Sequence, residues 1–213
     1  MNLANNIADR LLQINAIKLN AAKPFIWSSG LHSPIYCDNR LILSYPEERK
    51  IVIKALTREA SNYEGINAIA GVATAGIAWG AYVADALGLP YCYVRNKPKD
   101  HGLKNLIEGR LPQASIVLVV EDLISTGGSS IDAVEALQLD GYHVSGVLSI
   151  FQYGFNSAKM RFEDKKIKFS SLTNFETLLA RALSANFISK EEFLRLQSWN
   201  QDPKLWSETY GKP

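Results

Sequence analysis

The stretch Leu118-Val-Val-Glu-Asp-Leu-Ile-Ser-Thr-Gly-Gly-Ser-Ser130 decides how this chain is expected to fold. It begins with an apolar run, which is typical of a strand buried on both faces of a parallel sheet. Two adjacent carboxylates, Glu121 and Asp122, end that run. A loop of small residues follows, and apolar residues at Ile131 and Val134 then indicate one face of a helix.

The loop in this stretch has the chemistry of an anion site. Glycines let backbone N–H groups approach an anion closely, and the start of a helix adds free N–H groups and a positive dipole end. The two acids lie at the carboxyl end of the strand, where open α/β sheets bind ligands. The pattern therefore indicates a sugar phosphate, with its phosphate in the loop and its hydroxyls on the acids. The alternative is an ordinary buried strand with a polar exit turn.

Composition is typical of a cytoplasmic enzyme with a real core. The chain has 213 residues, of which 47% are hydrophobic, and a net charge of +2, which favours neither a nucleic-acid partner nor a membrane surface. No segment approaches the ~18 apolar residues of a membrane span, and the N-terminus does not have the pattern of a signal peptide. Cys37 and Cys92 lie far apart without metal-ligand spacing, so we expect buried, reduced thiols in the cytoplasm.

The remaining sequence alternates between helix and strand patterns, which predicts a doubly wound, mainly parallel sheet flanked by helices. A helix from Ser44 to about Tyr63 is expected to begin with a Ser-x-x-Glu capping box. Short strands and turns are expected over Phe25–Arg40, and two helices after the last strand. The other expected elements are an N-terminal amphipathic helix that includes Ile7, Leu11, Leu12 and Ile14, strands at 66–72, 91–95 and 141–151, a helix reaching Ala86, and an edge strand at 167–172.

The stretch 118–130 resembles the phosphoribosyl pyrophosphate (PRPP) signature of the type I phosphoribosyltransferases. An apolar run, two acids, two apolar residues and a Ser/Thr/Gly loop occur in that order without gaps. The resemblance implies the fold of that family, with a small N-terminal hood at about 15–45 and a mobile loop at about 96–112 within one domain, 1–213. The segment Gly71-Val-Ala-Thr-Ala-Gly76 lacks the Lys-Ser/Thr of a P-loop and resembles the family's pyrophosphate loop.

Two further segments resemble the orotate phosphoribosyltransferases within that family. Arg95, Lys99, His101 and Gly102 match the R-x-x-x-K-x-H-G loop of the family, although Asn96 replaces a common Lys. Proline and glycines within this basic segment argue against regular structure. The segment from Phe25 to Arg40 is similar to the W-S-S-G hood of one bacterial branch, with Ser28 where many members carry a Lys. Tyr153-Gly154 stands where many members place an Arg.

The resemblance implies transfer of a phosphoribosyl group from PRPP to orotate, with Mg²⁺ held mainly by PRPP, in a homodimer that shares the mobile loop. The residues that it implies are Lys99, His101, Glu121 and Asp122 for catalysis; Arg95, Lys99, His101, Glu121, Asp122, Leu123, Ile124, Ser125, Thr126, Gly127, Gly128 and Ser129 for PRPP; Ala73, Thr74, Ala75 and Gly76 for pyrophosphate; and Ser28, Tyr36, Ser125 and Tyr153 for orotate.

Three alternatives differ in sequence features. A purine or uracil phosphoribosyltransferase shares the 118–130 pattern but differs in the hood and the basic loop. A PRPP-sensing regulator without catalysis is expected to lose the basic loop or to gain a DNA-binding appendage, and neither is seen. A P-loop nucleotide hydrolase needs Gly-Lys-Ser/Thr, which is absent.

Overall fold

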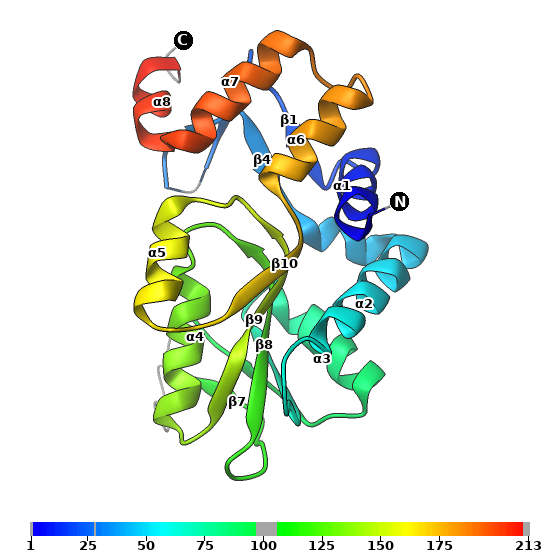
Figure 1. The fold of residues 1–213 in the computed structure, drawn as a ribbon, viewed down its shortest axis with the longest axis vertical. Coiled ribbons are helices and arrows are strands. Elements are labelled where there is room, and N and C mark those ends of the chain that lie inside the picture. Colours follow the sequence, from blue (N-terminus) through cyan, green and yellow to red (C-terminus); the bar gives the residue numbers. More distant parts are fainter. Residues whose placement is uncertain (1, 28, 97–105, 211–213) are drawn as a thin grey trace. The chain divides into compact units, whose positions relative to one another are not determined.

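The computed structural model describes residues 2–27, 29–96 and 106–210. These residues form two compact units, one of residues 1–48 and 173–213 and the other of residues 49–172. The second unit carries most of a six-stranded sheet whose strand order is β10-β9-β8-β5-β6-β7 (Figure 1). The strands are β5 (Ala68–Val72), β6 (Tyr91–Val94), β7 (Ile107–Glu108), β8 (Ile116–Ile124), β9 (His143–Gln152) and β10 (Phe169–Asn174).

The centre of the sheet is parallel, as the sequence predicts. β5 pairs in parallel with β6 and with β8, and β8 pairs in parallel with β9. Helices α4 (Gly128–Leu139) and α5 (Asn156–Asp164) lie on one side of the sheet, and α2 (Pro46–Ala60) and α3 (Gly76–Leu87) lie on the other (Figure 1). The doubly wound, mainly parallel fold is therefore confirmed.

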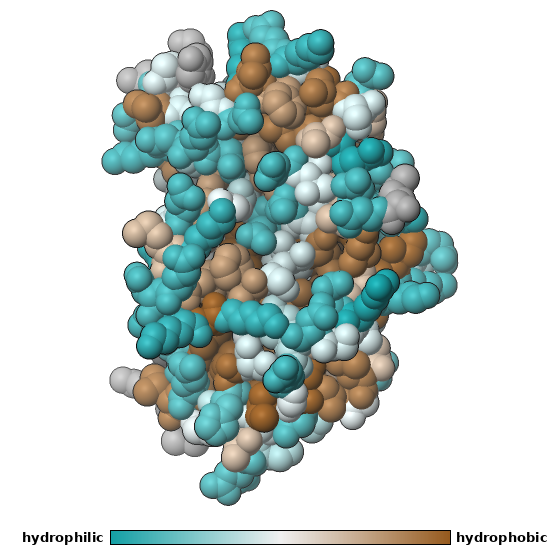
Figure 2. Space-filling view, in the orientation of Figure 1, coloured by the Kyte–Doolittle hydropathy of each residue, from teal (hydrophilic) through white to brown (hydrophobic). Residues whose placement is uncertain are grey.

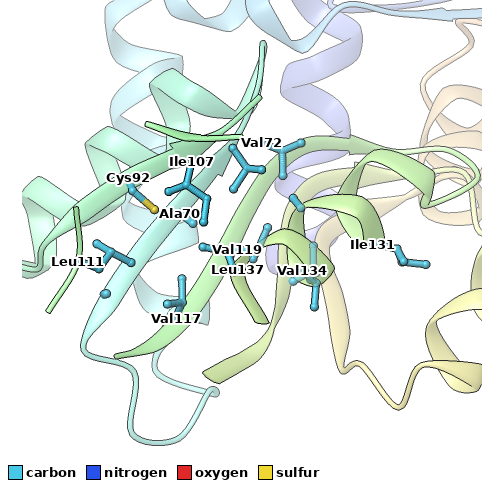
Figure 3. Close-up of a cluster of buried hydrophobic side chains, with 14 of the residues drawn as sticks. Ala70, Val72, Cys92, Ile107, Leu111, Val117, Val119, Ile131, Val134 and Leu137 are labelled. Carbon is cyan, nitrogen blue, oxygen red and sulfur yellow. The ribbon is translucent and has the colours of Figure 1, made fainter. Parts of the chain in front are cut away.

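The core forms because successive residues of each central strand point to opposite faces of the sheet, and helices cover both faces. Val117 and Val119 of β8 are fully buried against the apolar face of α4, which carries Ile131, Val134 and Leu137 (Figure 3). Their neighbour Leu118 points to the opposite face, where α3 contacts both β5 and β8, and it is also fully buried. Burial of each such side chain contributes roughly 1.5–3 kcal/mol.

The first unit contains the short strands of the hood segment and the ends of the chain. Asp9 accepts two hydrogen bonds from Arg181, at 2.7 and 2.9 Å, which join α1 to α6. Trp199 is fully buried and packs edge-on against Trp27, with ring centroids 5.7 Å apart. The elements are α1 (Leu3–Gln13), β1 (Ile17–Leu19), β2 (Phe25–Ile26), β3 (His32–Ser33), β4 (Ile35–Cys37), a 3₁₀ helix (Asn39–Ser44), α6 (Phe175–Ser184), α7 (Lys190–Gln201) and α8 (Pro203–Tyr210).

Three expectations about local structure are wrong. Ser44 ends the 3₁₀ helix and α2 begins at Pro46, so Ser44 does not directly precede α2 as its predicted cap would. Ile107–Glu108 forms β7, antiparallel to β6, within the basic segment expected to lack regular structure. Three helices rather than two follow β10 in the described part of the chain, because Asp202 begins a further helix by accepting a hydrogen bond from the Leu205 amide at 2.9 Å.

The burial of the two cysteines and the hydropathy of the surface do not indicate a specific function. Cys92 is buried, and burial raises the pKa of its thiol to about 12, whereas Cys37 is only half-buried. Hydrophilic residues cover much of the face drawn in Figure 2, with hydrophobic ones between them. Among the described residues, no helix combines the length and the apolar character that a membrane crossing requires.

Candidate active site

The order of the strands places a crevice between β5 and β8. From β5 the chain passes to β6, which lies on one side of β5. It later returns to β8, which lies on the other side of β5. The loops that leave the carboxyl ends of β5 and β8 therefore diverge to opposite faces of the sheet. Such a switch point is where open α/β sheets bind ligands.

A cleft of about 230 Å³ opens at this switch point. The two loops and the acidic pair, which are far apart in the sequence, share its lining. The lining residues are Ala73, Thr74, Ala75, Glu121, Asp122, Leu123, Ser125, Thr126, Gly127, Gly128, Ser129 and Ser130. Most of the residues implied for PRPP and pyrophosphate are thus brought together in the structure.

The two acids occupy different environments. Glu121 is only 6% exposed and its Oε1 accepts a hydrogen bond from the Asp122 amide at 3.0 Å, whereas Asp122 is half-buried. Burial, reinforced by the negative charge of Asp122, raises the pKa of the Glu121 carboxyl well above its usual range. Asp122 is therefore the more open carboxylate at rest, and a cation placed beside the pair favours ionisation of both acids.

The loop after β8 has the geometry of a phosphate cradle. Strand β8 continues through the acids to Ile124, and Gly127 then adopts a left-handed conformation with φ 77° and ψ 0°. Helix α4 begins at the next residue, Gly128, and its first turn, whose N–H groups have no partner within the helix, lines the cleft. Behind the loop, the ring of Phe162 lies 2.8 Å from the position that a Cβ on Gly127 would occupy.

The loop after β5 packs more tightly than the loop after β8. The Ala73 amide donates to the Val94 carbonyl at 2.8 Å, and the peptide bond between Ala73 and Thr74 is cis. Helix α3 begins at Gly76, where a Cβ would stand 2.6 Å from the backbone oxygen of Val120. Glycine at this position lets the start of α3 lie directly against the strand that carries the acids.

Arg95 lines a second cavity of about 170 Å³ beside the cleft. Ser129 lines both spaces, so the cavity adjoins the phosphate cradle. The guanidinium of Arg95 lies 3.4 Å from the carboxylate of Glu108 on β7. The pairing is possible because β7 returns antiparallel beside β6.

The other predicted residues are not part of the lining of the cleft or lie outside the described residues. Lys99, His101 and Ser28 belong to the undescribed segments. Tyr36 lies on β4 in the first unit, with its ring centroid 5.7 Å from that of Phe25. Tyr153 directly follows β9 and is 3% exposed, with its ring stacked on that of Phe155 at 5.2 Å.

Arg161 is a neighbour of the cleft that the sequence does not single out. Its Nη1 lies 3.4 Å from the position of a Cβ on Gly128. Arg161 belongs to α5, which follows the next strand, and no motif joins it to the loop. Only the packing of α5 beside α4 brings the two together.

A comparison with family models matches residues 42–168 to the phosphoribosyl transferase domain, which is more than half of the chain. That match and the cleft at the switch point define the class of protein: a phosphoribosyltransferase.

Known relatives narrow the class. The chain is 52% identical over 206 residues to the orotate phosphoribosyltransferase of Bacteroides fragilis, which covers 96% of this chain and 97% of the relative. It is 46% identical over 209 residues to that of Cytophaga hutchinsonii, covering 98% of this chain and all of the relative. The crystal structure of orotate phosphoribosyltransferase from Aeropyrum pernix superposes with a TM-score of 0.75 at 28% identity, over 86% of this chain and 99% of that one. This chain belongs to the orotate phosphoribosyltransferase family.

Proposed function

The chain is a pentosyltransferase of the orotate family, and we propose that its cleft binds PRPP for transfer of the 5-phosphoribosyl group to orotate. The products of this reaction are orotidine 5′-monophosphate and pyrophosphate, in the biosynthesis of the pyrimidine nucleotide UMP. One observation carries the assignment of the cleft: the two loops and the acid pair line a single space of about 230 Å³.

The acid pair suits the charge that develops on the ribose. As pyrophosphate leaves the anomeric carbon, the ring gains positive, oxocarbenium-like charge, as in glycoside cleavage. Asp122, the more open acid, accepts hydrogen bonds from the ribose hydroxyls, and the buried Glu121 adds negative charge beneath the ring. The orotate nitrogen attacks directly, so no protein nucleophile is assigned. The loop Ser125–Ser129 holds the 5′-phosphate through backbone N–H groups.

The leaving pyrophosphate is assigned to the loop Ala73–Gly76 and to the cations Arg95, Lys99 and His101. Because negative charge on the leaving group grows in the transition state, Lys99→Ala is expected to lower kcat more than it weakens PRPP binding. Lys104→Ala, in the same basic segment but outside the matched pattern, is the control. A pyrophosphate-release assay measures both variants, and equal turnover for Lys99→Ala and wild type contradicts the assignment.

Mg²⁺ fits the donor chemistry of the cleft as an ion held mainly by substrate. Among the described residues, no cluster of three His, Cys, Asp or Glu side chains offers a complete protein site. The adjacent carboxylates of Glu121 and Asp122 nevertheless provide hard oxygen donors beside the proposed phosphates. Burial and the charge of Asp122 raise the pKa of Glu121, and a cation bound beside the pair would favour the ionised form of Glu121. When bound, Mg²⁺ supplies positive charge to the diphosphate and ribose oxygens.

Orotate recognition is assigned to Ser125 at the cleft and to Ser28, Tyr36 and Tyr153. Ser125 lines the cleft directly. Tyr153 donates its backbone N–H to the Ile124 carbonyl at 3.1 Å, and this bond joins it to the residue before Ser125. With its ring buried, Tyr153 acts by holding the end of β8 in place.

The acceptor is tested by competition between bases. Purified enzyme is expected to release pyrophosphate from PRPP with orotate and not with uracil, hypoxanthine or adenine. Turnover with a purine and none with orotate would overturn the assignment.

We also propose that the enzyme is a cytoplasmic homodimer in which Lys99 and His101 of one subunit complete the site of its partner. The buried thiol of Cys92, which forms no disulfide, supports a reducing compartment. Mixing inactive Lys99→Ala and Asp122→Asn chains is expected to restore about a quarter of wild-type activity, because half of the dimers are mixed and each has one intact site. Mixing that restores no activity contradicts the shared loop.

A further inference from the structure

Arg161 stands at the rim of the phosphate loop, although it comes from helix α5. Its Nη1 lies 3.4 Å from the place where a Cβ on Gly128 would stand, and Gly128 is the first residue of α4. The side chain is exposed. Within the described part of the chain, it makes no hydrogen bond or ion pair through its guanidinium. Its five N–H donors are therefore available to a ligand.

Packing on both sides of Arg161 fixes the position of α5 against the loop. Phe162, the next residue, is fully buried under Gly127 and stacks on Phe169 with ring centroids 4.2 Å apart. One turn further on, Lys165 pairs with Glu135 of α4. Arg161 thus projects from a segment that is anchored both to the loop Ser125–Ser129 and to α4, the helix that follows this loop.

The charge of the cleft calls for such a cation. The described residues that line it include two acids, Glu121 and Asp122, and no Lys, Arg or His. A phosphate monoester carries about −1.5 to −2 charge at pH 7, so it would join two carboxylates in one small space. Backbone N–H groups and the dipole of α4 supply only partial charges. Arg161 is the full positive charge nearest to Gly128 among the groups around that glycine.

We propose that the guanidinium of Arg161 binds the 5′-phosphate of PRPP against the loop Ser125–Ser129. Guanidinium groups bind phosphate oxygens through paired, charge-assisted hydrogen bonds, and the planar fork of Arg suits this better than the point charge of Lys. The 5′-phosphate does not react, so the contact is equally strong in the ground state and in the transition state. This inference rests on the proposed position of the 5′-phosphate in the loop.

Binding of ribose 5-phosphate and of pyrophosphate separates the two ends of PRPP. Arg161→Gln removes the charge and keeps a polar, although shorter, side chain. Calorimetry is expected to show about 10-fold weaker binding of ribose 5-phosphate to Arg161→Gln, and unchanged binding of pyrophosphate. Arg161→Lys is expected to recover part of the loss. Lys159→Gln, which changes an exposed cation on the same helix about 200° around its axis, is the matched control and is expected to bind both ligands as wild type does.

Kinetics give a second readout. The KM for PRPP is expected to rise about 10-fold in Arg161→Gln, while kcat and the KM for orotate stay within about 2-fold, because a uniform binding contact is lost. Unchanged binding of ribose 5-phosphate would overturn the inference, as would a loss confined to pyrophosphate or an equal loss in Lys159→Gln. Failure of wild type to turn over orotate, with ribose 5-phosphate binding still lost in Arg161→Gln, would overturn the acceptor assignment and support the role of Arg161.

Discussion

Two loops of the sheet share a plan, strand then loop then a helix that begins with glycine, but use their glycines differently. The loop after β5 ends at Gly76, which lets α3 press against the backbone of β8 beside the acids. The loop after β8 ends at Gly127 and Gly128, where the chain turns left-handed and leaves backbone N–H groups open to the cleft. The first glycine serves close packing, and the second pair lies in the loop that we propose as an anion site.

The largest effect is expected for Gly76→Ala, which tests the close packing. The new Cβ would stand 2.6 Å from the Val120 backbone oxygen, which cannot move without moving the acid strand. We expect a loss of roughly 2–3 kcal/mol in the free energy of unfolding, near the upper end of overpacking costs, together with a large loss of activity.

Gly88→Ala is the control for this substitution, because Gly88 caps the other end of α3 with φ 65° and nothing within 4 Å of a new Cβ. It carries backbone strain alone, about 1 kcal/mol, and is expected to keep activity. Equal losses of stability in the two variants would mean that Gly76 is needed for its backbone conformation rather than for the close approach of α3 to β8.

Glu121→Gln tests the acid pair, which lines the cleft together with both loops. Loss of the negative charge beneath the ribose is expected to lower kcat by roughly 100-fold. The same change is expected to stabilise the protein at neutral pH. Burial raises the folded-state pKa of Glu121, so the stability of the wild type falls as pH rises from about 4.3, the usual value for Glu, through that folded-state pKa.

The stability of Glu121→Gln relative to wild type should therefore grow between about pH 4 and pH 8, because Gln does not titrate. Chemical denaturation at both pH values measures the difference. A difference that shrinks as pH rises would mean that Glu121 is held ionised in the folded enzyme.

The smallest effects on stability are expected in the anion loop. Gly127→Ala places a Cβ at a positive φ and 2.8 Å from the ring of Phe162, so we expect a loss of about 1–2 kcal/mol. Gly128→Ala meets the far end of Arg161 at 3.4 Å and the hydroxyl of Thr126 at 4.0 Å, and it is expected to cost under about 1 kcal/mol. Thermal unfolding ranks the pair, and a greater loss for Gly128→Ala would contradict the assigned roles.

The sequence predicts the strand, loop and helix around residues 118–130 well and the surrounding contacts poorly, for physical reasons. The run from Leu118 to Ser130 combines local signals, apolar burial and glycine turns, that act within a few residues. The sequence does not predict β7, because this strand has only two residues and is held in place by its pairing with β6. Ser44 lies in a Ser-x-x-Glu pattern that is typical of a helix cap, but in the structure it is the last residue of the preceding 3₁₀ helix.

The contact of Arg161 with the loop has no local signal at all. It arises because Phe162 is buried beneath Gly127, and the partners of a buried ring are not encoded by spacing along the chain. The pattern of small residues thus predicts the loop that lines the cleft, but not the cation that we propose to lie beside it. The same limit applies to Glu108, whose pairing with Arg95 depends on the return of the chain through β7.

We propose that the acid pair and the loop after β8 hold the two ends of one ribose phosphate. A crystal structure of the enzyme with orotidine 5′-monophosphate bound tests it most directly. We expect the 5′-phosphate against the backbone N–H groups of Ser125–Ser129 and the ribose hydroxyls within hydrogen-bond distance of Asp122. A phosphate bound at Ala73–Gly76, or a ribose turned away from both acids, would contradict the account.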